Sequence, residues 1–116
     1  MASNIILFGW NRPTPGREKV SAQHFDEFVK YLGGLQQKGA IQGFETVLLD
    51  PHGGDFNGFF LIKGDSTKLE ALVSTTEWIT HITRALHHLD RSGVIGGVTG
   101  KEVMERMALW TSVIPS

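Results

Sequence analysis

The sequence predicts one α+β domain in which two main helices cover one face of a four-stranded antiparallel sheet. Three observations support this prediction. Segments rich in β-forming apolar residues alternate with segments whose apolar residues recur with helical spacing. Clusters of glycine, proline and aspartate separate the segments. The length of 116 residues is typical of one domain, so residues 1–116 are expected to form a single folded unit.

The first predicted unit is a strand followed by a long helix. Residues 4–10 are apolar on both alternating faces, which is typical of a strand covered on both sides. Two prolines and a glycine in residues 11–16 predict a loop. Helical spacing then runs from residue 17 to residue 38, and Gly39 is a suitable stop. The apolar stripe of this helix contains Val20, Phe25, Phe28, Val29, Leu32 and Leu35.

A hairpin and a second helical region follow. Residues 41–49 and 56–64 are rich in β-formers, and the turn-forming residues 50–55 join them. Asp65 and Ser66 offer N-cap oxygens to a short helix. Ser74 and Glu77 then have capping-box spacing, which predicts the start of a second main helix that ends near Asp90. The stripe of this helix contains Trp78, Ile79, Ile82, Ala85, Leu86 and Leu89.

The C-terminal part predicts a fourth strand and an additional helix. Residues 93–98 combine three glycines with Val94, Ile95 and Val98, and are interpreted as the strand. Thr99 and Glu102 again have capping-box spacing, which predicts a terminal helix that ends before Pro115. A strand over residues 105–114 is the alternative, because apolar residues also alternate there.

This order of elements is the split βαβ arrangement repeated once, so a ferredoxin-like βαββαβ fold is predicted. Right-handed crossovers place both main helices on one face of the sheet. The other face is then uncovered, although the strands are apolar on both faces: Phe59 and Leu61 alternate with Phe60 and Ile62. Such a face exceeds the apolar patch that a monomer usually exposes. A second copy of the chain is therefore expected to cover it in a homodimer. The alternative is that the terminal helix folds back over it.

Composition excludes several classes of protein. Hydrophobic residues make up 41% of the chain and charged residues 20%, which is typical of globular domains. The formal net charge of −1 gives no general attraction to nucleic acid or to an anionic membrane, and neither is expected as a partner. The chain has no cysteine, and its N-terminal apolar run is too short for a signal core or a membrane span. The expected location is the cytoplasm.

A diffuse set of residues resembles a known family. It runs from about His24 to Trp78 and includes Gly39, the glycine-bearing hairpin loop, the run of residues 58–62, and residues 64–66. In these features the chain resembles the dimeric α/β-barrel superfamily and, within it, the small YCII-related proteins. The resemblance implies paired ferredoxin-like subunits, among which cofactor-free enzymes occur. It also implies a histidine early in the first helix, for which His24 is the nearest residue. Residues 75–77 stand where such proteins carry an aspartate.

Histidines are the natural candidates for a general base at neutral pH. His24 and His81 are selected as candidate catalytic residues. Trp10, Arg12 and Trp78 are selected as candidate substrate-binding residues, because Arg12 can bind a carboxylate and a tryptophan can form a pocket wall. A further set is considered. His81 and His88 lie on one flank of the second main helix, with Arg84 between them, where they either line a pocket or face solvent.

No motif predicts a metal or a cofactor. The histidines of the second main helix lack the i, i+4 spacing of a metal clamp. Asp50, His52 and Asp55 share the hairpin loop as a possible carboxylate–imidazole pair, although turn formation explains them equally. The glycine-rich residues 93–100 follow a helix and have no Lys-Ser/Thr partner, so they do not form a phosphate loop.

The preferred functional hypothesis is a homodimer that binds a small molecule, in its more specific form a cofactor-free enzyme acting on a small organic substrate. A non-catalytic dimerisation module is the second hypothesis. An RNA-binding sheet is the third, because Phe8, Trp10, Phe59 and Phe60 lie on the first and third strands. Asn57, at the position of the usual basic residue, and the slightly acidic net charge argue against this third hypothesis.

Overall fold

The computed structural model describes residues 2–116. The elements in chain order are β1 (Ile5–Trp10), β2 (Arg12–Pro13), α1 (Glu18–Gln37), β3 (Gly43–Leu48), β4 (Gly58–Lys63), α2 (Ser66–Val73), α3 (Thr76–Leu86), β5 (Leu89–Asp90), β6 (Gly93–Gly97) and α4 (Lys101–Ser112). No helix within residues 2–116 is long and apolar enough to cross a membrane.

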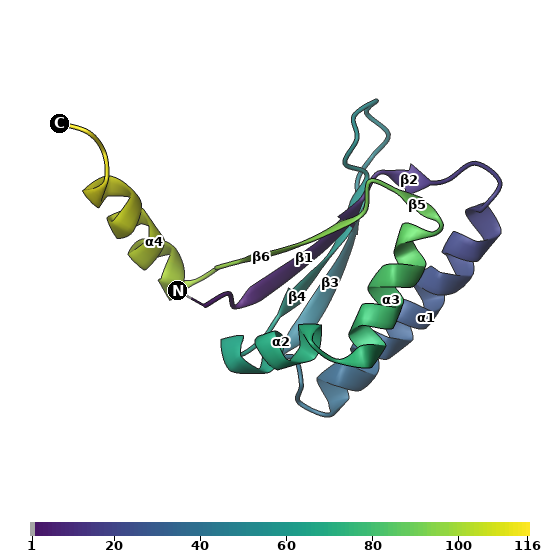
Figure 1. The fold of residues 1–116 in the computed structure, drawn as a ribbon, viewed down its shortest axis with the longest axis horizontal. Helices are drawn as coiled ribbons and strands as arrows, with labels where there is room; N and C mark the ends of the chain where they lie inside the picture. The colour runs from purple at the N-terminus through teal and green to yellow at the C-terminus, as the bar shows by residue number, and fades with distance from the viewer. Residues whose placement is uncertain (1) are drawn as a thin grey trace.

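The main sheet is antiparallel with strand order β3-β4-β1-β6. Phe8 at the centre of β1 lies opposite Phe60 of β4 and Val94 of β6. Helices α1, α2 and α3 all lie on one side of this sheet (Figure 1). The predicted ferredoxin-like α+β fold is confirmed, and every predicted strand of the main sheet is present.

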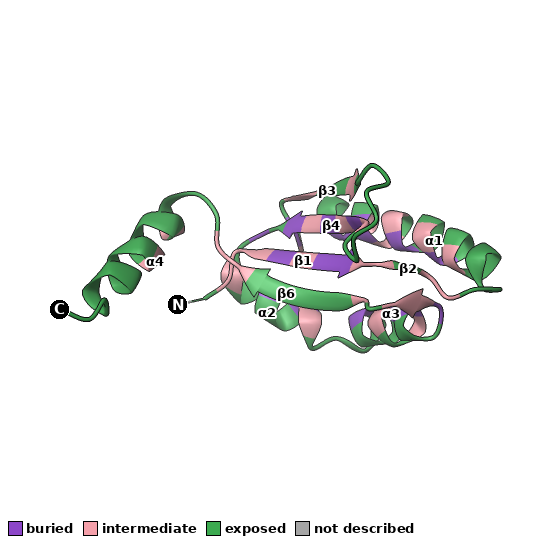
Figure 2. Ribbon diagram, turned by 90° about the horizontal axis from the view of Figure 1, so that it is seen from above, coloured by how far each residue is buried: buried purple, intermediate pink, exposed green. Residues whose placement is uncertain are grey.

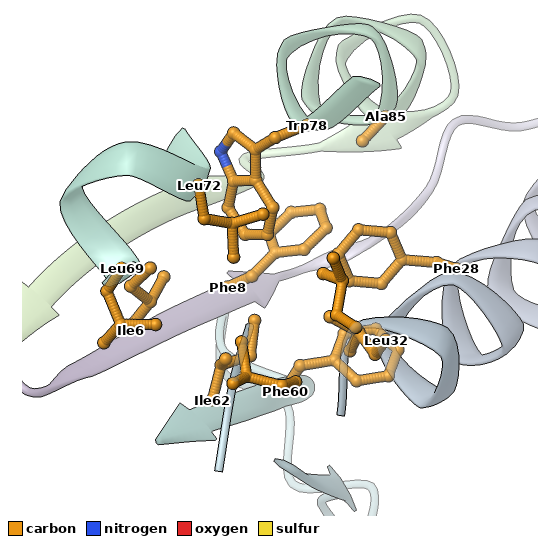
Figure 3. Packing of buried hydrophobic residues seen from close by; sticks show 12 residues of the cluster. Ile6, Phe8, Phe28, Leu32, Phe60, Ile62, Leu69, Leu72, Trp78 and Ala85 are labelled. Carbon is orange, nitrogen blue, oxygen red and sulfur yellow. The ribbon is translucent and has the colours of Figure 1, made fainter. Parts of the chain in front are cut away.

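The hydrophobic core fills the space between the sheet and its three helices (Figure 3). The even-numbered residues of β1 and β4 point into it, because successive side chains of a strand alternate between faces. Phe28 of α1 lies at the centre, with its ring centroid 5.0 Å from that of Phe60 and 5.4 Å from that of Phe8. The core residues are Ile6, Phe8, Phe28, Leu32, Leu35, Ile41, Phe60, Ile62, Leu69, Leu72, Trp78 and Ala85.

The opposite face of the sheet, here called the open face, is covered by no helix of the described chain (Figure 1). It carries Ile5, Leu7, Phe59, Leu61 and Ile95, which register and alternation place on this side. Phe56 of the hairpin loop stacks on Phe59 at the rim, with ring centroids 5.4 Å apart. Ile95 is 65% exposed, so an apolar surface remains in contact with solvent.

Helix α4 extends away from the rest of the molecule (Figures 1 and 2). The predicted terminal helix is therefore confirmed, and the alternative strand over residues 105–114 is wrong. None of the residues of α4, all of them described, is buried, so the alternative in which this helix covers the open face is also wrong. The radius of gyration of 15.9 Å exceeds the roughly 13 Å of a compact domain of this length, because α4 projects outward.

Two predicted helix starts differ from the structure. Thr75, and not Ser74, is the N-cap of α3, and its Oγ1 accepts a hydrogen bond from the amide of Trp78. Ser74 is instead the C-cap of α2. At α4 the N-cap is Gly100 with a φ of +71°, a conformation that glycine adopts without strain. The Thr99 amide donates to Asn4 Oδ1 at 2.9 Å, so a distant side chain replaces the predicted capping box.

The end of α3 and the loop after β1 also differ from expectation. Helix α3 ends at Leu86 because Leu89 and Asp90 pair with Pro13 and Arg12 as the small sheet β5-β2. Prolines in residues 11–16 predicted a loop throughout. The pairing tolerates Pro13 because the neighbouring amides of Asn11 and Thr14 make the backbone hydrogen bonds, to Asp90 and His88. This small sheet fixes the chain just after α3 against the start of α1.

One residue of the predicted α1 stripe is misplaced. Val20 is 49% exposed, whereas His24, which was not counted as a core position, is buried with Phe28, Leu32 and Leu35. The buried face of α1 therefore begins with a polar residue. Because His24 lies on the buried face of α1, it reaches the interface with α3.

Candidate functional site

Four side chains form a continuous row of hydrogen bonds between α1 and α3, here called the histidine chain. Ser21 Oγ lies 2.6 Å from His88 Nδ1, and His88 Nε2 lies 2.7 Å from His24 Nδ1. His24 Nε2 lies 3.0 Å from His81 Nδ1. All three histidines are buried, at 3%, 8% and 4% exposed for His24, His81 and His88. Both ring nitrogens of His24 and of His88 are thus engaged within the protein.

Helical spacing on two facing helices assembles this chain. Ser21 and His24 are three residues apart on α1, which places them on one face. His81 lies in α3 and His88 follows its C-cap, seven residues or about two turns later. The carbonyl of His88 accepts the Thr14 amide at 2.8 Å, so the β2-β5 pairing holds His88 against α1.

Aromatic rings and one ion pair enclose the chain. Tyr31 stacks on His81 with ring centroids 4.4 Å apart, and Phe28 packs edge-on against both His24 and His81. Arg84 Nη1 of α3 and Glu27 Oε2 of α1 are 2.6 Å apart, so this ion pair joins the same two helices. The packing fixes the ring planes, because each imidazole is held by rings and hydrogen bonds together.

The histidine chain carries no net charge at neutral pH. Burial, with a smaller effect of the Arg84 charge and of the neighbouring histidines, lowers the pKa of His24 from 6.5 to about 4. Burial and Arg84 also lower the pKa of His81 and of His88. A neutral imidazole donates from one nitrogen and accepts at the other. All hydrogen bonds of the chain therefore run in one sense, either from Ser21 towards His81 or back.

The Ser21 end of the histidine chain lies at the wall of a cavity of about 450 Å³ between the end of the sheet, α1 and β5. Ser21, His24 and His88 supply its polar wall. Most of the remaining wall is apolar and consists of Phe8, Trp10, Pro13, Ala22, Phe25, Phe28, Leu48, Phe60 and Leu89. Glu18 and Asp26 line it from the solvent side of α1, and no lysine or arginine among the described residues does so.

Trp10 takes its place in the cavity wall because Gly58 lies opposite it. The two residues are register partners in β1 and β4. A Cβ atom at position 58 would lie 2.7 Å from the indole ring, closer than atoms can pack. Only glycine leaves this space free, so the indole lies flat across β4. From there it contacts Phe25 and Phe60 edge-on or tilted, at centroid distances of 6.4 and 5.4 Å.

The structure distributes the five predicted site residues over four places. Trp10 and His24 line the cavity, and His81 belongs to the histidine chain behind it. Trp78 is a core residue, 3% exposed, and does not line the cavity. Arg12 lies outside the cavity, next to the hairpin loop, with its Nε 3.5 Å from Asp90 Oδ2.

Sequence reasoning did not select Ser21 or His88 as site residues. It also left open that His81 and His88 face solvent, and this alternative is wrong, because the flank that carries them is packed against α1. A signal existed in the spacing. Ser21 and His24 repeat on one face of α1, and His81 and His88 repeat on one face of α3, as two facing helices require.

The other candidate residues do not converge. His52 Nδ1 hydrogen-bonds the backbone carbonyl of Asp50, and Asp55 pairs with Arg91, so no carboxylate–imidazole pair forms in the hairpin loop. Within residues 2–116, no cluster of three or more histidine, aspartate or glutamate side chains is arranged to hold a metal ion.

Comparison with known proteins supports the fold alone. No family model matches the chain, and no curated protein matches it. A solved structure described as a dimeric protein of unknown function with a ferredoxin-like fold, from Bacteroides fragilis, matches with a TM-score of 0.57 at 9% identity. The match covers 82% of this chain and 96% of the other. The relation to YCII-related proteins stays a prediction.

Proposed function

We propose that the protein binds a small, uncharged and mainly apolar organic molecule in the cavity and acts on it as a cofactor-free enzyme. The observation that carries this proposal is the histidine chain, which ends at the wall of the cavity. Buried polar networks that meet an apolar pocket are typical of ligand sites, and imidazoles that stay neutral near pH 7 can accept a proton.

The charges around the cavity favour a neutral ligand. Glu18 and Asp26 repel an anion, and Arg12, once considered for binding a carboxylate, is paired with Asp90 outside the cavity. A volume of about 450 Å³ lies within the range of small-molecule pockets, roughly 300–1,000 Å³.

The two other hypotheses have less support. A non-catalytic dimerisation module has no need of convergent polar groups at a pocket, which this cavity has in Ser21, His24 and His88. An RNA-binding sheet needs aromatic rings on its open face. Phe8 and Phe60 are buried under the helices and Trp10 lines the cavity, which leaves Phe59 alone of those four residues on the open face.

Binding of 1-naphthol and of 1-naphthoate, measured by calorimetry, tests the ligand class. We expect the neutral naphthol to bind, and the carboxylate to bind about tenfold more weakly because of Glu18 and Asp26. Ala22→Trp should abolish binding, because Ala22 lines the cavity and an indole would fill it. Ala108→Trp on exposed α4 is the matched control and should bind normally. Equal binding by wild type and Ala22→Trp would place the ligand elsewhere and contradict the proposal.

We further propose that the protein is a homodimer in which the open faces of two copies pack together, as in a dimeric α/β barrel. The Bacteroides fragilis protein of similar fold is dimeric. On this chain, Leu7, Phe59, Leu61 and Ile95 offer an apolar surface that no helix of residues 2–116 covers. A second copy supplies a matching apolar surface by symmetry.

Sedimentation velocity tests the pairing. Leu61→Glu places a carboxylate at the centre of the open face, opposite Glu45, and should convert the dimer into single subunits. Thr46→Glu puts the same charge on the other face of β3 and should remain dimeric. A wild-type chain that sediments as one subunit at micromolar concentration would show this proposal to be wrong.

A further inference from the structure

The hydrogen bonds of the histidine chain determine which of its groups is free to meet a bound molecule. His24 and His88 line the cavity, but each has both ring nitrogens engaged with protein partners. His81 is not part of the cavity wall. When the hydrogen bonds run from Ser21 towards His81, Ser21 Oγ donates its proton to His88 Nδ1 and keeps two lone pairs that this bond does not use. In the reverse sense His88 Nδ1 donates to Ser21 Oγ, and the hydroxyl donates to the His88 carbonyl at 3.3 Å. A nucleophilic serine requires the first sense. Ser21 also lines the cavity. The reactive end of the chain is therefore a serine hydroxyl.

We propose that Ser21 is a nucleophile activated by His88, and that the substrate is a small, neutral, mainly apolar ester. This inference rests on the proposed function and deepens it. An activated nucleophile is defined by a base within hydrogen-bond reach, which is itself oriented by a third group. Here the base is His88 at 2.6 Å, and the orienting group is His24 at 2.7 Å from the second nitrogen of His88.

The acyl transfer balances without any other reactant than water. Ser21 Oγ forms a bond to the ester carbonyl carbon while its proton passes to His88 Nδ1. The ester C–O bond then breaks, and the leaving alcohol takes that proton. Water next attacks the acyl carbon, gives one proton to His88, and releases the acid as the carbon–Oγ bond breaks. The proton returns from His88 to Ser21, so ester and water become acid and alcohol.

The other members of the histidine chain support this step. While His88 carries the extra proton, its Nε2–H donates to His24 Nδ1, and His24 Nε2–H donates to His81 Nδ1. The hydrogen bonds of the histidine chain therefore keep the same direction throughout the reaction. His24 and His81 act as positioning residues. Glu18 and Asp26 disfavour retention of the acid product.

Labelling with diisopropyl fluorophosphate tests the nucleophile directly. Attack of Ser21 Oγ on phosphorus forms the P–O bond, breaks the P–F bond, and releases fluoride with the serine proton. We expect one adduct per chain by intact mass spectrometry, mapped to Ser21 by fragmentation. Its rate should exceed that of the exposed Ser112 on α4 about a hundredfold, the usual contribution of a general base. Label that is absent, or spread equally over the serines, would overturn the inference.

Variants at three positions, Ser21, His88 and Ser112, complete the test. Ser21→Ala should remove the adduct, whereas Ser112→Ala should keep it. His88→Gln should slow labelling of Ser21 about a hundredfold. Because His88→Gln removes a buried hydrogen-bonding group and is at risk of misfolding, Ser21→Cys gives an independent measurement in a chain that has no other cysteine. Its alkylation by iodoacetamide at pH 6.5 should be faster than that of Ser112→Cys, since His88 accepts the thiol proton. Equal rates would overturn the role of His88.

The labelling and the naphthol binding separate the two proposals. Binding in the cavity without labelling of Ser21 means that the nucleophile is wrong while the ligand site stands. Failure of both means that the cavity site itself is wrong.

Discussion

Phe28→Ala is expected to destabilise the protein by about 4 kcal/mol. Phe28 is 2% exposed and its ring lies between the sheet and α3, against Phe8, Phe60 and Trp78. Removing the ring loses its burial and leaves a cavity that these large aromatic neighbours cannot fill without leaving their rotamers. Urea unfolding followed by far-UV circular dichroism measures the effect.

Val20→Ala is the matched control for this prediction. It lies on the same helix but is half exposed, so its truncation should change the free energy of unfolding by less than about 0.5 kcal/mol. Phe28→Leu keeps part of the volume and should fall between the two. A loss below about 1 kcal/mol for Phe28→Ala would mean that the core is centred elsewhere.

Alternating apolar residues predicted the sheet well, because a strand that is apolar on both faces leaves few alternatives for its pairing. Residues 4–10 and 56–64 contain β1 and β4, which pair in the middle of the sheet. The handedness of the crossovers, and not the apolar pattern, predicted that the two faces differ in their cover. Phe60 is buried at 2% exposed, and its neighbour Phe59 is only partly buried.

Helix starts were less predictable, because a capping box is a local signal that competes with long-range contacts. Thr99 does not form the predicted capping box, because Asn4, the residue before β1, accepts the hydrogen bond from the Thr99 amide. Ser74 lost its role because α2 ends there, and its neighbour Thr75 has the extended backbone that an N-cap needs.

The candidate site was only partly visible in the sequence for a similar reason. His24 and Trp10 stood out as residue types, but their meeting with Ser21 and His88 depends on the contact between α1 and α3 and on the β2-β5 pairing. A two-residue pairing that includes a proline has no sequence signature. Helical spacing placed His81 and His88 on one flank correctly, yet it could not tell whether that flank faces water or another helix.

Acid is expected to destabilise the fold between pH 6.5 and pH 4 through the histidine chain. The pKa of His24 is about 4 in the folded protein and 6.5 in the unfolded chain, since burial and the Arg84, His81 and His88 side chains oppose its protonation. Above pH 6.5 both states carry a neutral His24, and its contribution is complete. As the pH falls, the unfolded chain binds a proton that the folded protein does not, so the free energy of unfolding decreases.

The expected loss from His24 is about 3 kcal/mol by pH 4, of which about 2 kcal/mol is lost by pH 5. The lowered pKa values of His81 and His88 act in the same direction. Urea midpoints at pH 7.5, 6.0 and 5.0 measure how the free energy of unfolding changes with pH above the range in which carboxylates titrate. His24→Gln should lower stability at pH 7.5 but flatten the slope, because the residue that excludes the proton is gone. His52→Gln, on the exposed hairpin loop, should change neither value. Equal wild-type midpoints at pH 7.5 and 5.0 would mean that the three histidines bind protons in the folded state as readily as in the unfolded chain. The histidine chain would then not be neutral at pH 5.0, and the prediction would be wrong.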